Sequence, residues 1–141
     1  MRQLLDTHTF MRTRCLGLPQ AREMSVWFVT GNSRINEKVR LQIENNDNLI
    51  SIASLWEIAI KSSIGRLDLD LSIEQLVEEQ IAANGIEILN ITTQHIAVVA
   101  NLPLHHRDPF DRLIISQAIV ENLPIVGVDK AFDSYVVRRL W

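Results

Sequence analysis

Four carboxylic acids stand where a predicted strand ends or a predicted helix begins. They are Asp6, Glu57, Asp111 and Asp129. The first and last each follow a short apolar run that predicts a buried strand, and the other two lie in the first turn of a predicted helix. Each acid alone suits a helix cap. In a parallel sheet, however, the carboxyl ends of the strands share one edge, so all four are expected to meet there.

Four acids at one edge repel one another unless a cation compensates their charge. Mg²⁺ and Mn²⁺ prefer oxygen ligands, and such an ion activates water and neutralises charge on a phosphate. The four acids are therefore candidate catalytic and metal-binding residues of a phosphoryl-transfer site.

The stretch Leu104–Ile115 reads as a loop that turns into a helix. Pro109 suits the first helical position, where its missing N–H is not needed. Asp108 then caps the helix, which leaves Asp111 available for another role.

Composition indicates a single globular domain over residues 1–141, with 47% hydrophobic and 22% charged residues. The net charge of −3 provides no overall basic field, so contact with nucleic acid would need local cations or metal ions. The single cysteine, Cys15, suits a reducing compartment. There is no apolar run of about 20 residues and no signal peptide pattern, so we expect a soluble cytoplasmic protein.

Strand and helix patterns alternate along the chain. Predicted strands cover residues 3–5, 49–52, 86–91, 124–128 and 135–140, and predicted helices cover 36–44, 55–64, 72–83, 92–101 and 109–121. This alternation predicts an α/β three-layer sandwich with a mainly parallel central sheet. Ser54 with Glu57, and Ser72 with Gln75, have the spacing of capping boxes.

Residues 11–26 break the regular pattern. They contain three arginines against one glutamate, together with Gly17 and Pro19, and show no sustained period. Their few apolar side chains are too scattered to offset the entropy of ordering the segment. We expect a protruding insertion at about 11–26 that lies outside the sheet.

Several stretches together resemble one known family. They are Leu4–Thr7, Ala53–Lys61, Gly65–Leu67, Leu102–Ile114 and Pro124–Asp129. They are similar to PIN-domain ribonuclease toxins of the VapC type, from type II toxin-antitoxin systems. The resemblance implies a PIN fold, cleavage of RNA phosphodiester bonds with Mg²⁺ or Mn²⁺, and a cognate antitoxin as partner.

The resemblance also implies site roles. Asp6, Glu57, Asp111 and Asp129 match the family's first to fourth acids. Thr7 and Asp108 are expected to support these acids without binding the metal ion themselves. Candidates for holding the RNA backbone are Lys61, Arg66, Arg107 and Arg112.

The predicted helix 55–64 is apolar on nearly every side, so it has more apolar surface than packing against one core would bury. We therefore expect a homodimer, further covered by the antitoxin, as the resemblance also implies.

Three other interpretations remain open from the sequence. The insertion leaves room for a catalytically impaired PIN-fold binding module that still contacts an antitoxin. His105 and His106 with Asp108 suggest a weak zinc site. Asp6 at a strand end also suits haloacid dehalogenase phosphatases, although these need a second aspartate where this chain has His8.

Overall fold

A five-stranded sheet forms the centre of the molecule. The computed structural model describes residues 1–13 and 36–141. Its strands are β1 (Arg2–Leu5), β2 (Asp47–Ser51), β3 (Glu87–Leu89), β4 (Ile125–Val126) and β5 (Arg139–Leu140). They lie in the order β3-β2-β1-β4-β5, and every neighbouring pair is parallel. The predicted parallel α/β sheet is therefore confirmed, with β1 at its centre.

Helices and helical turns connect these strands. They are α1 (Thr7–Thr13), α2 (Glu37–Glu44), α3 (Ile52–Ser63), α4 (Ile73–Gln75), the π-helical η2 (Leu76–Ile81), the 3₁₀ turns η3 (Ala82–Asn84) and η4 (Lys130–Ser134), α5 (Thr93–Asn101) and α6 (Pro109–Glu121). Among the described residues, no helix combines the length and the apolar character that crossing a membrane requires.

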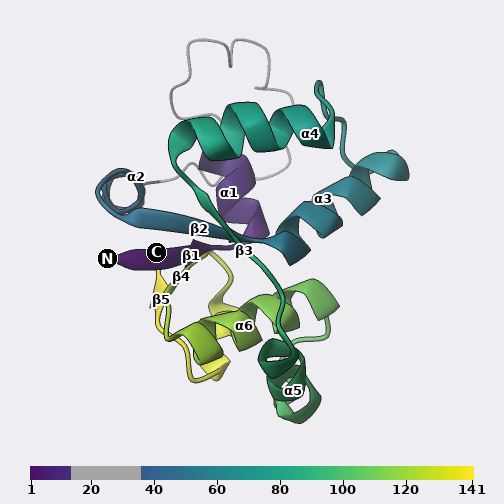
Figure 1. Cartoon of the computed structure of the whole chain (residues 1–141). Helices are drawn as coiled ribbons and strands as arrows, with labels where there is room; N and C mark the ends of the chain where they lie inside the picture. The colour runs from purple at the N-terminus through teal and green to yellow at the C-terminus, as the bar shows by residue number, and fades with distance from the viewer. Residues whose placement is uncertain (14–35) are drawn as a thin grey trace.

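Two hydrophobic cores lie on opposite faces of the sheet because successive strand side chains alternate. Leu5, Ile50 and Val126 point to one core, with apolar residues of α1, α2, α3 and η2. Their neighbours Leu4 and Leu49 point to the other core, with α6 and η4. Figure 1 shows α1 and α4 above the sheet and α6 below it, with α5 packed on the outside of α6. This arrangement is the predicted three-layer sandwich.

The helix that carries Asp111 begins as the sequence predicts. Asp108 is its N-cap and accepts hydrogen bonds from the backbone N–H groups of Phe110 and Asp111, with Pro109 in the first turn. The helix ends at Asn122, which adopts a left-handed conformation.

The helix that carries Glu57 begins three residues earlier than predicted. Its N-cap is Ser51, which ends β2 and accepts the N–H of Ala53, so the capping box of Ser54 and Glu57 does not form. Ser54 is instead fully buried, and its hydroxyl contacts Thr7. The earlier start places Glu57 in the second turn of α3.

The predicted insertion cannot begin at Met11. Helix α1 continues to Thr13, and the side chain of Met11 is buried in the first core. Residues 14–26, the rest of the proposed loop, lie outside the described residues.

Candidate active site

The four predicted acids come from four elements that meet at the carboxyl edge of the sheet. Asp6 directly follows β1, and Asp129 follows β4, which pairs with β1. Glu57 lies on α3 and Asp111 in the first turn of α6. The negative charges of Glu57 and Asp6 both raise the pKa of Asp111, so these three carboxyl groups share one region of electrostatic interaction.

Asp6 is held in a narrow space. Its side chain is buried, and Oδ1 accepts a hydrogen bond from the backbone N–H of Thr9. A Cβ atom at Gly127 would lie 2.7 Å from the other oxygen, Oδ2, and 2.9 Å from the ring of Phe132. The Asp6 carboxylate therefore occupies space that is available only because residue 127 is a glycine.

Glu57 has a hydrogen-bond partner on each carboxylate oxygen. Lys61 Nζ lies 2.6 Å from Oε1, and Thr7 Oγ1 lies 2.8 Å from Oε2. Ser54 Oγ is 2.9 Å from the same Thr7 hydroxyl. Because Glu57 is buried, these contacts fix its orientation and compensate its charge. Thr7 and Lys61 thus hold the Glu57 carboxylate from two sides.

Asp111 has a strongly perturbed ionisation. Burial, followed by the charge of Asp108 and with further contributions from Glu57 and Asp6, raises its pKa to about 7, against a partial opposing effect of His106. Its carboxyl group therefore holds a proton far more tightly than an exposed aspartate does.

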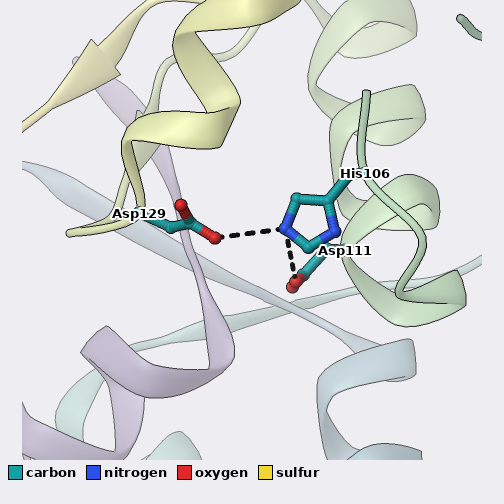
Figure 2. A group of neighbouring side chains, drawn as sticks. All are labelled: His106, Asp111 and Asp129. Atoms are coloured by element: carbon teal, nitrogen blue, oxygen red, sulfur yellow. Dashed lines mark hydrogen bonds and ion pairs between the residues drawn. The ribbon is translucent and has the colours of Figure 1, made fainter. Parts of the chain in front are cut away.

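Asp129 shows the opposite behaviour. The backbone N–H of Ala131 and a hydrogen bond from His106 hold the pKa of Asp129 below its usual value. His106 Nε2 lies 3.1 Å from Oδ2 of Asp129 and 3.2 Å from Oδ2 of Asp111. Figure 2 shows the imidazole ring joining the two acids.

These residues fit a divalent cation. Carboxylate oxygens of Asp111 and Asp129 lie within 4.8 Å of each other, and a ring nitrogen of His106 lies within the same distance of both, so the two acids can share one ion. Burial, and then repulsion by neighbouring acids, raises the pKa of Asp111, and a bound cation would relieve this unfavourable charge. Hard carboxylate oxygens dominate the neighbourhood, which favours ions such as Mg²⁺ and Mn²⁺.

A family model supports the sequence resemblance. The model of the PIN domain matches residues 24–137, which is most of the chain. The chain belongs to the PIN domain family. No curated protein sequence is significantly similar to it.

Solved structures agree with this PIN fold. A chain of VapBC2 from Rickettsia felis, described as bound to a DNA fragment from their promoter, has a TM-score of 0.62 and 17% identity, and the match covers 99% of this chain and 98% of that one. A chain of FitAcB from Neisseria gonorrhoeae has a TM-score of 0.63 and 18% identity, with 100% and 97% covered. The family model begins at residue 24, after β1 and Asp6. The two superpositions cover nearly the whole chain, so the likeness in fold includes β1 and Asp6.

Two residues of this PIN domain's site were missed by the sequence analysis. In the sequence, His106 stood out only as half of a possible zinc pair, and Gly127 had no predicted role. The zinc set does not form in the described structure, because His105 packs edge-on against Tyr135, with ring centroids 5.2 Å apart, and Asp108 caps α6. The position of His106, two residues before the cap of α6, was the available signal.

The predicted RNA-binding cations differ in their surroundings. The side chains of Arg66 and Arg107 are exposed and make no hydrogen bond or ion pair within the described part of the PIN domain. Arg112 instead donates to the carbonyl groups of Leu102 and Pro103 at 3.0 and 2.9 Å, with longer contacts to two further carbonyls. Arg112 thus ties the end of α5 and the following loop to α6.

Replacing Arg112 with methionine is expected to lower the free energy of unfolding by about 2 kcal/mol, because several hydrogen bonds from a charged donor to backbone carbonyl groups are lost. Urea denaturation at constant pH measures this. Arg112→Lys should not restore stability, since one ammonium group cannot span the separate carbonyls. Arg107→Met is the matched control and should change stability by less than about 0.5 kcal/mol. Equal stability of the Arg112→Met and Arg107→Met proteins would show that the carbonyl contacts do not contribute.

Proposed function

We propose that the protein is an Mg²⁺- or Mn²⁺-dependent endoribonuclease toxin that a cognate antitoxin neutralises. The observation that carries the proposal is the meeting of carboxylates at the carboxyl edge of the sheet, where oxygens of Asp111 and Asp129 lie within 4.8 Å of each other. Burial and acidic neighbours raise the pKa of Asp111 in this setting. A domain that keeps acids in such a buried, mutually repelling group at the carboxyl edge of its sheet is expected to bind a cation with them. The motifs that resemble VapC-type toxins support the choice of RNA as substrate.

In this proposal Asp6, Glu57, Asp111 and Asp129 hold the metal. When bound, the ion supplies an activated water and neutralises charge on the phosphate. Thr7 and Lys61 hold both oxygens of Glu57 in place. The exposed side chains of Arg66 and Arg107 bind the RNA backbone, which the net charge of −3 would otherwise repel.

The proposed partners are the antitoxin and a second copy of the chain. Trp56 on α3 and Ile64 at its C-cap each expose 59% of their surface, and Trp56 packs edge-on against Phe110. Large exposed apolar side chains on one helix suit a protein interface. The fold shared with a chain of VapBC2 agrees with an antitoxin as partner.

The test compares the purified chain with its Asp6→Asn variant on single-stranded RNA in the presence of Mg²⁺ or Mn²⁺. Cleavage by the wild type should require metal, stop with EDTA and fall by at least about 100-fold in the variant. Asp133→Asn is the matched control, because Asp133 is an exposed acid paired with Arg139. Single-stranded DNA of the same sequence tests the choice of RNA.

Two results would contradict the proposal. Equal cleavage by wild type and Asp6→Asn would exclude the acid site as the source of activity. A folded wild-type chain that binds an antitoxin but cleaves no RNA with any divalent metal would instead favour the catalytically impaired binding module.

A further inference from the structure

We infer that His106 is a positioning residue that holds Asp111 and Asp129 together through its Nε2–H, an inference that rests on the proposed metal-dependent function. The two acids come from different elements, the first turn of α6 and the loop before η4. In the described structure, His106 Nε2 lies within 3.2 Å of an oxygen of each. Figure 2 shows both contacts made by the same ring nitrogen.

Several contacts fix the position of the His106 ring. Its plane stacks on the ring of Phe132, with centroids 6.1 Å apart and planes inclined by 22°. The backbone N–H of His106 donates to the hydroxyl group of Tyr135 at 2.6 Å. The side chain is only 15% exposed. Packing against residues 132–135 thus holds the imidazole at the base of the same loop that carries Asp129.

Hydrogen bonding assigns the tautomer. The backbone N–H of Asp108 points to His106 Nδ1 at 3.3 Å, so Nδ1 acts as an acceptor. A neutral imidazole has one acceptor and one donor nitrogen, which places the proton on Nε2. Nε2 therefore donates a hydrogen bond to Asp129 Oδ2 and places its N–H within 3.2 Å of Asp111 Oδ2, whereas a metal ligand would need a free lone pair at that atom.

A donor in this position orients the two acids without using up their capacity to bind metal. Each carboxylate oxygen has two lone pairs, so it can accept the His106 hydrogen bond and still face a cation. Partners behind metal ligands that fix orientation in this way typically contribute about 10- to 100-fold to metal affinity. The His106 N–H also offsets part of the repulsion between the acids before a cation arrives.

The test measures binding of Mg²⁺ and Co²⁺ to the full chain by calorimetry at one fixed pH. His106→Gln places an amide donor near the position of Nε2 and should keep both affinities within about threefold of wild type. His106→Leu removes the donor and should weaken both metals by about tenfold or more. His105→Leu is the matched control at the exposed neighbouring histidine and should leave both affinities unchanged.

Using two metals separates a positioning donor from a ligand. Loss of an imidazole ligand would weaken Co²⁺ much more than Mg²⁺, because nitrogen ligands favour Co²⁺. If His106→Leu lowers the melting temperature in EDTA, His106→Asn, which is polar but too short to reach both acids, should show the same equal loss for both metals.

Three outcomes would overturn the inference. They are unchanged or tighter metal binding by His106→Leu, a loss confined to Co²⁺, and a glutamine variant as weak as the leucine variant. If the wild type binds metal and cleaves RNA while any of these occurs, the positioning role alone is wrong. A wild-type chain that binds neither metal overturns the proposed function together with it.

Discussion

Replacing Asp111 with asparagine is expected to abolish RNA cleavage and, at the same time, to stabilise the metal-free protein above pH 7. The amide cannot replace a charged metal ligand, so activity should fall by about 1,000-fold or more. The gain in stability has a different cause. Ionised Asp111 is buried beside like charges, which the neutral asparagine removes.

The pH dependence of stability follows from the raised pKa. Unfolded chains lose the Asp111 proton near pH 3.8, whereas the folded chain keeps it up to about pH 7. Between these values the folded state binds more protons, so this group lowers the free energy of unfolding as pH rises from about 4 to 7. The Asp111→Asn protein should lack this decrease and be about 2 kcal/mol more stable than wild type at pH 8, with little difference at pH 4.

Thermal or urea unfolding in EDTA at pH 4, 6 and 8 measures this difference. Adding Mg²⁺ at pH 8 should raise the melting temperature of the wild type by mass action and that of the variant much less. The exposed variant Asp133→Asn again serves as control and should retain the Mg²⁺ response. A variant less stable than wild type at pH 8 without metal would show that Asp111 is not a buried, repelled charge.

Replacing Gly127 with alanine should have the second-largest effect, although the change is one methyl group. The new Cβ would approach Asp6 Oδ2 to 2.7 Å and the Phe132 ring to 2.9 Å. Because Thr9 holds the other oxygen of Asp6, the carboxylate has little room to turn away. We expect stability to fall by about 2 kcal/mol from overpacking and cleavage to fall by about 100-fold from the displaced ligand.

Gly85→Ala is the matched control for this substitution. Gly85 has a φ of 65°, with no atom near the added methyl group, so alanine costs about 1–2 kcal/mol through backbone strain alone. At a temperature where both the Gly85→Ala and the Gly127→Ala proteins are folded, the cleavage rate of Gly85→Ala should match that of the wild type. Full activity in the folded Gly127→Ala protein would mean that the position of Asp6 tolerates displacement.

Local sequence signals determined much of this PIN domain. Asp108 and Pro109 fix the start of α6 through short-range capping, so the position of Asp111 follows from its immediate neighbours. The apolar runs before Asp6 and Asp129 form neighbouring parallel strands, which brings these acids to one edge of the sheet. The two core faces likewise follow from the alternation of side chains along short strands.

Competition between nearby signals was less visible in the sequence. Ser51 and Ser54 both suit an N-cap, and the end of β2 selected Ser51. Ser54 was then free to turn inward to Thr7, which carries the hydrogen bond to Glu57. A capping pattern alone does not contain this information, because it depends on where the preceding strand stops.

Only the tertiary structure decided how the acids are partnered. His106 reaches Asp111 and Asp129 because Phe132 and Tyr135, distant in sequence, pack against it. The partner of Lys61 is a local matter by comparison, because Lys61 lies four residues after Glu57 on the same helix and this spacing already allows the observed ion pair, beside the predicted RNA-binding role. Long-range packing sets the contacts of His106, because the residues around its ring come together only in the assembled fold.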